Sequence, residues 1–428
     1  MTIIFILGYI AIALEHPLRI NKAAPALLLG VLTWTVYAFG STNPHLIDEN
    51  LLEHFGEIAS ILFFLVGAMT IVEIVDAHDG FAVITNSIKT TNKVKLLWII
   101  SIITFFLSAA LDNLTTSIVM ISLLRKLIKD KSDRMFFAGI VVIAANAGGA
   151  WSPIGDVTTT MLWIANKVTS ANIMIRLIIP SLICMVVPLI ILSFKMKGTF
   201  DRPESAEGST DHISNGERNL VFFTGIGGLL FVPVFKTITH LQPFMGMLFS
   251  LGVVWVVTEL IHKRKETVVK EMLSPLTILR KIDTSSVLFF LGILVGVASL
   301  ESSGILGDAA LWLDHAISNQ NIITISIGLL SSIVDNVPLV AAGMGMYHPD
   351  PAVISSVHEF GIDGVFWEFL AYCAGTGGSV LIIGSAAGVA VMGLEKINFI
   401  WYLKKISWIA LVGYFAGAAA YIAIEHFL

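Results

Sequence analysis

The sequence predicts an all-α polytopic membrane protein of two inverted repeats, with about ten transmembrane helices, two re-entrant hairpins and broken helices at the midplane. Three observations predict this fold: composition, an internal repetition, and different charges around two similar segments. Of the 428 residues, 56% are hydrophobic and 13% charged, whereas soluble domains have about 25% charged residues. Apolar runs of about 20 residues without alternating polarity favour helices over a β-barrel.

The N-terminal segment MTIIFILGYIAIALEHP has no basic leader and no small-residue cleavage site. It therefore predicts a short first span rather than a signal peptide. Cys184 and Cys373 lie in predicted spans without metal-ligand spacing, and we expect them to be core residues. The formal net charge of −5 is small for this length. We expect membrane lipid, and no nucleic acid, as a partner.

Comparison of the chain with itself shows an internal repetition. Residues 60–65 (SILFFL) match 286–291 (SVLFFL) at an offset of 226, and 111–113 (LDN) match 334–336 (VDN) at 223. The segment NAGGAWSPIGD from Asn146 matches GTGGSVLIIGS from Gly375 at 229. Three matches in the same order predict a duplication, with a first repeat at 1–194, a linker at 195–219 and a second repeat at 220–428.

Residues 96–124 are too many for one span and too few for two spans with a turn, at a rise of about 1.5 Å per residue. This length predicts a re-entrant hairpin, and its basic flanks place both ends in the cytoplasm. A second hairpin is predicted at 323–346, inside a stretch from 282 to 395 that has no Lys or Arg. We expect this hairpin to open to the outside, which inverts the second repeat.

The other charged segments agree with this orientation. Basic residues expected on the cytoplasmic side are Arg19, Lys22, Lys263, Arg264, Lys265, Lys396, Lys404 and Lys405, together with the polar linker 195–219. Acidic residues expected outside are Asp48, Glu49, Glu53 and Glu57.

Two further helices are predicted to be broken, at 135–164 and 364–394. The first contains Gly148, Gly149, Pro153 and Gly155, and the second contains Gly375, Gly377 and Gly378. Unwound backbone inside a membrane is tolerated only where protein or a cavity satisfies it, and its free carbonyl groups are natural cation ligands.

Side chains with oxygen atoms lie beside these breaks and form the candidate cation and proton site. They are Asp112, Asn113, Thr115, Thr116, Ser152, Asp156, Thr158 and Thr159 in the first repeat, and Asp335, Asn336, Thr376, Ser379 and Ser385 in the second. Hard cations prefer such oxygen ligands, and no His or Cys cluster near the breaks suggests a transition metal.

Three of these residues, Asp112, Asp156 and Asp335, are carboxylates, and no Lys or Arg lies in the breaks to counter them. An anionic substrate would be repelled, so we expect Na⁺ at these three carboxylates. Desolvation raises the pKa of a carboxylate towards working pH, so the same groups can take protons instead. The capping of helix N-termini is the alternative role for the aspartates, and bonding within a helix is the alternative for the hydroxyls.

Weaker candidates lie at the inner end of the 58–76 span. Glu73 and Asp76 fit either an inner vestibule or a solvated interface. His78 titrates in the right range for a pH sensor, although a single interfacial histidine is more often structural.

At these motifs the chain resembles the NhaD family of Na⁺/H⁺ antiporters, within the ion transporter superfamily. The resemblance rests on EHPLRINKAAPALL, SAALDNLTTSIVM, NAGGAWSPIGDVTTTMLW, SIVDNVPLVAAGMGMY and GTGGSVLIIGSAAGVAVMG, which span Glu15 to Gly393. It implies exchange of Na⁺ or Li⁺ for H⁺ in a bacterial inner membrane, without a cofactor. It also implies a homodimeric scaffold and an elevator-like domain that holds the hairpins.

Two other functions remain as alternatives. An arsenite efflux carrier of the same superfamily has a neutral substrate, which needs fewer carboxylates. A gated cation channel would have symmetric pore rings, which the chain lacks. An enzyme is not expected, since no HExxH or nucleophile-elbow motif is present. Asp156 corresponds to Ser385, so we expect the first half to carry more of the proton chemistry.

Overall fold

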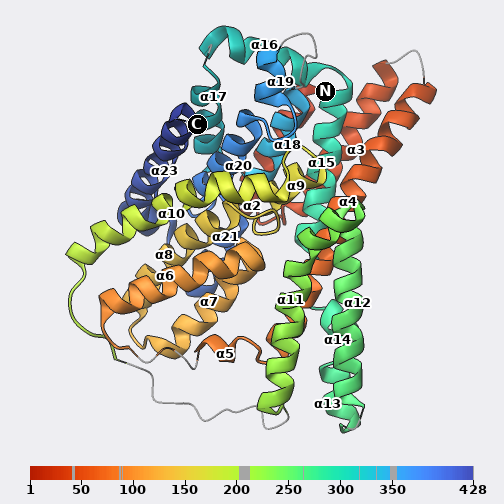
Figure 1. Ribbon diagram of the computed structural model, residues 1–428. Helices are drawn as coiled ribbons and strands as arrows, with labels where there is room; N and C mark the ends of the chain where they lie inside the picture. Colours follow the sequence, from red (N-terminus) through yellow and green to blue (C-terminus); the bar gives the residue numbers. More distant parts are fainter. Residues whose placement is uncertain are drawn as a thin grey trace.

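The computed structural model describes residues 1–40, 44–85, 88, 90–201, 213–263, 265–317, 319–333, 335–347 and 354–427. These residues form helices and contain no β-strand, only one isolated bridge between Asn92 and Thr199. The predicted all-α class is therefore confirmed (Figure 1). The central part of the predicted linker 195–219 lies outside the described residues.

Eight helical segments in the described part are long and apolar enough to cross a membrane. Their main helices are α3 (Ala23–Gly40), α4 (Pro44–Ala77), α6 (Lys93–Ala110), α10 (Ser170–Lys195), α11 (Asn215–Thr239), α12 (Pro243–His262), α15 (Thr284–Ser302) and α23 (Trp408–Phe427). The first helix, α1 (Thr2–Ala13), has 12 residues and is shorter than a full span.

Four breaks interrupt the helices of the chain. They separate α6 from α7 (Asn113–Leu127), α8 (Lys131–Ala150) from α9 (Val157–Ile164), α17 (Gln320–Leu330) from α18 (Asn336–Met346), and α20 (Val365–Gly377) from α21 (Ala386–Glu395). Each break falls inside a segment that the sequence marks as a hairpin or a broken helix. Short helices and turns complete the chain: α2 (Glu15–Leu18), α5 (Ala82–Thr85), α13 (Thr267–Met272), α14 (Pro275–Leu279), α16 (Ile305–Ile317), α19 (Ile354–Phe360), α22 (Phe399–Tyr402) and the π-helical turn η1 (Leu403–Ser407).

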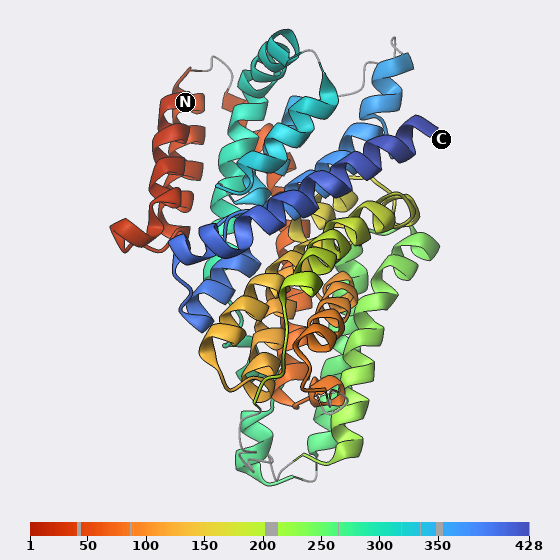
Figure 2. The same ribbon diagram turned by 90° about the vertical axis from the view of Figure 1, so that its left-hand side faces the viewer.

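The helices pack in two groups, visible from two directions (Figures 1 and 2). One group, which we call the scaffold group, contains α1, α3, α4, α11, α12 and α15. The other, the core group, contains α6 to α10, α17, α18, α20, α21 and α23 and includes all four breaks. In the core group α10 and α23 lie side by side.

Equivalent contacts recur at 223 and 229, two of the three offsets found in the sequence. Ser108 donates a hydrogen bond to the carbonyl oxygen of Ala145 (2.6 Å), and Ser331 donates to that of Ala374 (3.0 Å). A Cβ atom on Gly148 would collide with the backbone of Phe105, and one on Gly377 would collide with that of Gly328. The hairpin and the broken helix are thus packed against each other in the same way in both halves. This recurrence supports the predicted duplication, whereas its inversion across a membrane stays a prediction.

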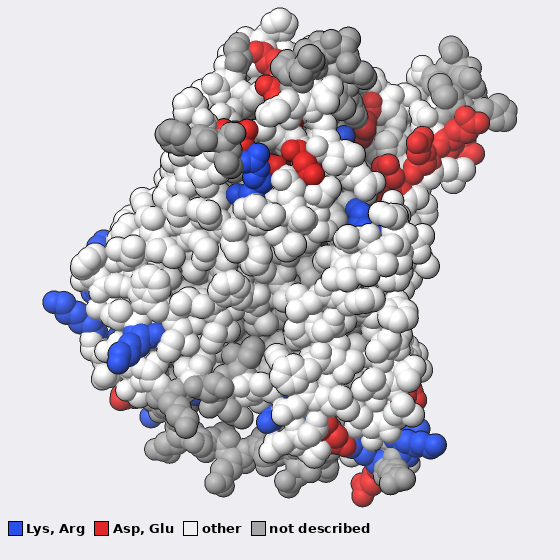
Figure 3. All heavy atoms as spheres, in the orientation of Figure 1, with Lys and Arg blue, Asp and Glu red and all other residues white. Residues whose placement is uncertain are grey.

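Charged side chains gather at different ends of the molecule (Figure 3). Most acidic side chains in this view lie in the upper part, many of them near the connection between α3 and α4, with a few basic side chains among them. Asp48, Glu49, Glu53 and Glu57 of α4 are all exposed there. Basic side chains lie at the lower end, where α12 ends, and at the edge where α10 ends. This separation agrees with the orientation that the sequence predicts.

Candidate functional site

Each break ends with a polar residue that caps the next helix. The side chains of Asp112, Asp156, Asp335 and Ser385 accept hydrogen bonds from backbone N–H groups at the start of α7, α9, α18 and α21, respectively. These caps form because the first N–H groups of a helix have no partner inside it. The capping role that the sequence left open for the three aspartates is therefore real, and Ser385 is a cap as well. Capping and ion binding are compatible, since a carboxylate has several acceptor positions.

The tips of the two hairpins converge on Asp156. Asn113 Nδ2 lies 2.6 Å from Asp156 Oδ2, and Asn336 Nδ2 lies 3.5 Å from Asp156 Oδ1. Thr158 donates to the same carboxylate from its backbone and from its hydroxyl group (2.9 and 2.7 Å). The side chains of Asp156 and both asparagines are nearly inaccessible to solvent. One buried carboxylate thus joins residues that lie 223 positions apart in the sequence.

Asn146 connects this centre to the second broken helix. Its amide oxygen accepts a hydrogen bond from Asn113 (3.0 Å), and its amide nitrogen donates to Ser379 (2.9 Å) and Ser385 (3.0 Å). In the sequence, Asn146 stands out only as the first residue of a repeat match, and it was not predicted as a site residue. Its equivalent in the second half is Gly375, and this difference within an otherwise repeated motif was the available signal.

Several candidate hydroxyls bond to backbone instead of the centre. Ser152 donates to the carbonyl oxygen of Ala109 (2.5 Å), Thr376 to that of Tyr372 (2.6 Å), and Thr159 to that of Ala150 (3.5 Å). Thr115 donates to Asp112 (2.7 Å). The hydroxyl of Thr116 is buried and has no hydrogen-bond partner among the described residues. The candidate hydroxyls that join the network around Asn146 and Asp156 are therefore those of Thr158, Ser379 and Ser385.

The three carboxylates have different surroundings. Asp112 bonds within its own helix start, through both the backbone and the hydroxyl of Thr115. The carboxylate of Asp156 accepts hydrogen bonds from the asparagines of both hairpin tips. In the described part of the chain, no three His, Cys, Asp or Glu residues lie close enough to hold one metal ion. Asp112, Asp156 and Asp335 therefore do not converge on a single position in this conformation.

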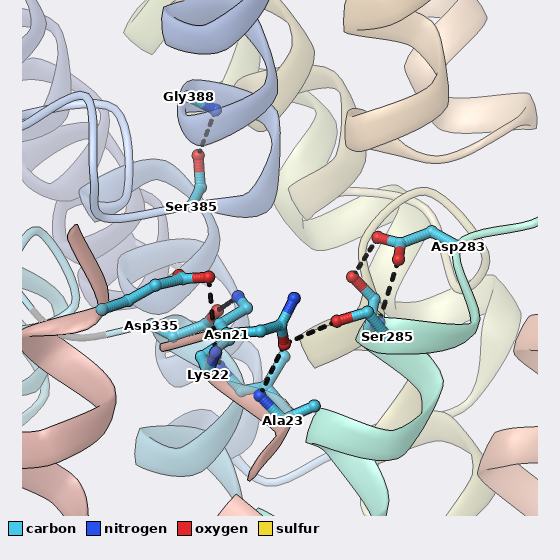
Figure 4. A network of polar contacts seen from close by, with 11 residues as sticks. Asn21, Lys22, Ala23, Asp283, Ser285, Asp335, Ser385 and Gly388 are labelled. Carbon is cyan, nitrogen blue, oxygen red and sulfur yellow. Dashed lines mark hydrogen bonds and ion pairs between the residues drawn. The ribbon is translucent and has the colours of Figure 1, made fainter. Parts of the chain in front are cut away.

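No Lys or Arg lies in the breaks, but a basic side chain from another part of the chain reaches Asp335. Lys22 Nζ lies 3.1 Å from Asp335 Oδ2, although 313 residues separate them in the sequence (Figure 4). The side chains of Lys22 and Asp335 are 19% and 13% exposed, so the pair is largely shielded from solvent. The short helix α1 ends well before a full span, and the turn after α2 then brings Lys22 to the start of α18.

Neighbouring residues of the scaffold group hold Lys22 in this position. Asn21 Oδ1 accepts hydrogen bonds from the backbone N–H of Ala23 (2.9 Å) and from the hydroxyl of Ser285 (2.7 Å) (Figure 4). The ammonium group of Lys22 lies 4.1 Å from the centre of the Phe289 ring, a cation–π contact. Because Ser285 and Phe289 belong to α15, the ion pair joins the scaffold group to a hairpin of the core group.

A cavity of about 240 Å³ reaches the first hairpin from one side. Three acidic side chains line it, Glu73, Asp76 and Asp283, with Lys281 as a single basic residue. Thr115, whose hydroxyl bonds to Asp112, lines it as well. Of the two roles that the sequence left open for Glu73 and Asp76, this arrangement favours the vestibule.

His78 is buried and not isolated. Its Nδ1 lies 2.6 Å from the carbonyl oxygen of Ile74, so this nitrogen carries a proton. Its Nε2 lies 3.1 Å from His262 Nε2, and the two rings stack with centroids 5.0 Å apart. Burial lowers the pKa of His78, and the charge of Lys265 lowers it further, while the hydrogen bond to Ile74 and the charge of Glu217 oppose this shift. A buried pair of this kind favours the structural alternative, and pH sensing by His78 stays a prediction.

Comparison with known proteins identifies the family. Residues 9–360 match the family model described as "Citrate transporter". The chain is 47% identical to Sodium/proton antiporter 1 of Arabidopsis thaliana, over all of this chain and 72% of that protein. It is 45% identical to Sodium/proton antiporter 2 of the same plant over the whole length of both. It is also 30% identical to the Na⁺/H⁺ antiporter NhaD of Vibrio cholerae, over 99% of this chain and 91% of that protein.

A solved structure shares the fold. The YdaH transporter of Alcanivorax borkumensis superposes with a TM-score of 0.59 at 10% sequence identity, over 95% of this chain and 98% of that one. Together with the long apolar helices, these matches show a multi-pass membrane protein. The motifs, the matched length and the identity to named relatives agree, and the chain belongs to the NhaD-type Na⁺/H⁺ antiporter family.

Proposed function

We propose that this protein is a secondary antiporter, and not an enzyme, that exchanges Na⁺ or Li⁺ for H⁺ at Asp156. One observation carries the proposal: the tip asparagines of both hairpins, Asn113 and Asn336, meet on this single buried carboxylate. Relatives that bear the name sodium/proton antiporter support the exchanged ions. The oxygen-rich surroundings suit a hard monovalent cation.

Cation binding at this centre requires the asparagines to change partners. Asn113 and Asn336 now present their NH₂ groups to Asp156. A rotation of each amide by about 180° would present its oxygen instead, because an amide carries a donor on one side and an acceptor on the other. The carboxylate and two amide oxygens would then face the cation, and the backbone carbonyl groups of the breaks complete its shell.

Proton binding and cation binding exclude each other at the same carboxylate. A buried carboxylate is costly unless a proton, a cation or hydrogen-bond donors neutralise it. When Na⁺ leaves, a proton takes its place and the amides return to their donor orientation. Exchange follows, because Asp156 is neutralised by one ion or the other.

Lys22 supplies the positive charge that Asp335 needs while no cation is bound there. A scaffold residue thus neutralises a core-group carboxylate. If the core group moves past the scaffold in an elevator-type step, this pair must open and re-form. We propose that Lys22 limits that movement to states in which Asp335 has another neutralising partner.

The charge of the site separates this function from two others. The description of the matched family model names citrate, which is a tricarboxylate at neutral pH. Asp112, Asp156 and Asp335 would repel it, and Lys22 is already paired with Asp335. Arsenite is neutral at neutral pH and gains nothing from three carboxylates. A cation fits the described charges best.

Transport in everted membrane vesicles tests the proposal. A pH gradient is formed, and Na⁺, Li⁺, citrate or arsenite is added in turn. We expect Na⁺ and Li⁺ to dissipate the gradient in vesicles with this protein but not in control vesicles. No response to Na⁺ from neutral to alkaline pH, with folded protein present, would contradict the proposal, and a response to arsenite or citrate would establish the corresponding alternative.

Three further features belong to the proposal as predictions. The lower end of the molecule with the linker faces the cytoplasm, the protein is a homodimer, and the membrane is a bacterial inner membrane. Labelling of single cysteines introduced at Lys263 and at Glu53 tests the orientation, since only one of them is expected to react from outside.

A further inference from the structure

A basic cavity lies apart from the ion site, at one edge of the core group. Its volume is about 570 Å³, within the range of small-molecule sites. The ends of α6, α8 and α10 and the segment from α22 to α23 surround it. Five lysines and one aspartate line it, with two tryptophans: Lys93, Lys195, Lys197, Lys404, Lys405, Asp133, Trp401 and Trp408.

Most of this positive charge is not neutralised by the protein. Lys93 is paired with Asp133 at 2.6 Å. Lys195 lies 4.3 Å from the centre of the Trp408 ring, which leaves its charge in place. Lys197, Lys404 and Lys405 are exposed and have no ion-pair partner among the described residues. The cavity therefore attracts an anion.

The walls of the cavity are fixed by contacts outside the lysines. The bridge between Asn92 and Thr199 ties the chain after α10 to the start of α6. The indole of Trp98 donates to Ser193 (2.9 Å) and holds the last turn of α10 against α6. The basic side chains thus project from a built cavity and not from a loose surface. Lysines project from this edge of the molecule in Figure 3.

Exposed apolar side chains adjoin the cavity. Phe194 at the end of α10 is 80% exposed, and Ile400, Leu403 and Trp408 are also exposed. Such residues on membrane helices face acyl chains, and tryptophans are enriched at the headgroup level. A free phosphate ion would make no favourable contact with these apolar side chains. A phospholipid would contact the lysines through its headgroup and the apolar side chains through its acyl chains.

We propose that this cavity binds the headgroup of an anionic phospholipid. The phosphate lies among Lys197, Lys404 and Lys405, and the acyl chains follow the apolar side chains of α10 and α22 to α23. All these lysines lie at helix ends that the charge pattern assigns to the cytoplasm, the side on which anionic lipids attract basic segments. The site is independent of the ion exchanged at Asp156.

Native mass spectrometry of the purified full chain in detergent tests the site. Phosphatidylglycerol, phosphatidylcholine and inorganic phosphate are titrated separately. We expect phosphatidylglycerol to be retained more tightly than phosphatidylcholine, and phosphate alone to be retained weakly. In K404Q/K405Q this preference should fall by about fivefold per lysine removed. K195Q/K197Q, on the opposite wall, should lose it as well.

The control is K263Q/K270Q, which removes two exposed lysines that do not line the cavity. It should keep the preference of the parent protein. Thermal unfolding without lipid shows whether each variant is folded. Equal retention of the two lipids by the parent, or an unchanged preference in both cavity variants, would overturn the proposal. Phosphate retained as tightly as phosphatidylglycerol would assign the cavity to a free anion instead.

Discussion

The two broken helices of the core group have the same backbone plan and different chemistry. In α8–α9 the first helix carries Asn146 and the break ends on Asp156, whereas the equivalent positions in α20–α21 are Gly375 and Ser385. Both breaks start their second helix with a side-chain cap. Only the first contributes a carboxylate, and Gly375 leaves space beside it, since a Cβ atom there would lie 3.7 Å from Asp156 Oδ2. The two broken helices thus share a backbone arrangement and differ in the side chains that they present at the break.

The hairpin tips differ in a second way. Asp112 and Asp335 cap their helices alike, but Asp335 is paired with Lys22, whereas the hydrogen bonds of Asp112 to described residues stay within its own helix start. A carboxylate with a built-in ammonium partner is neutral as a pair. The first half is therefore the one in which a cation or a proton must supply the missing charge.

The largest difference in exchange activity is expected between the variants Asp156→Asn and Ser385→Ala. Loss of the charged partner of a buried ion costs roughly 3 to 5 kcal/mol, so Asp156→Asn should abolish measurable exchange in vesicles. Ser385→Ala removes a cap and the hydrogen bond from Asn146 and should cost about 1 kcal/mol, a several-fold change in apparent Na⁺ affinity. Equal losses in both folded variants would mean that the halves are chemically equivalent.

Lys22→Gln should have the next largest effect. It leaves Asp335 without its ammonium partner, and removing one member of a shielded pair is destabilising, by up to roughly 3 kcal/mol here because both side chains are partly exposed. We expect lower thermal stability and a shifted pH profile of exchange. The double variant Lys22→Gln/Asp335→Asn removes both charges and should regain stability. If it is no more stable than Lys22→Gln, the two residues act independently.

Gly148→Ala and Gly377→Ala test whether the hairpin and the broken helix are packed in the same way in both halves. In each case the new Cβ would meet the backbone of the neighbouring hairpin. Overpacking of this kind typically costs about 1 to 3 kcal/mol. Thermal unfolding should show a similar loss for the two variants, with Gly252→Ala as a control, because its Cβ would meet nothing within 4 Å. A loss in one variant alone would argue against equivalent packing.

The smallest effect is expected at His78. Its lowered pKa keeps the imidazole neutral from neutral to alkaline pH, so no charge changes there over the working range. Because the unfolded chain takes up its proton at the ordinary histidine pKa, the stability of the folded state falls as the pH drops from that ordinary pKa towards the lowered one. His78→Gln should leave the pH profile of exchange in place. A shift of the profile with unchanged stability would restore His78 as a sensor.

Much of the fold and part of the candidate site could be predicted from the sequence. Composition marked the helices, segment length and flanking charges marked the two hairpins, and glycine positions marked the two broken helices, while the two Asp-Asn pairs marked the hairpin tips. Two residues of the candidate site, Asn146 and Lys22, were not predicted. Asn146 is an uncharged residue in a helix, and its only signal in the sequence is the difference from Gly375 within the repeated motif. Lys22 looked like an ordinary cytoplasmic charge, because its pairing depends on how far the short α1 carries the chain and on a contact across 313 residues.

Direct measurement of ²²Na⁺ binding to the purified protein tests the central claim, that Asp156 holds the exchanged cation. The parent protein, Asp156→Asn and Ser385→Ala are compared at alkaline pH, after thermal unfolding has shown that each is folded. The account predicts saturable binding by the parent and by Ser385→Ala, and none by Asp156→Asn. Binding by Asp156→Asn with the affinity of the parent would contradict it.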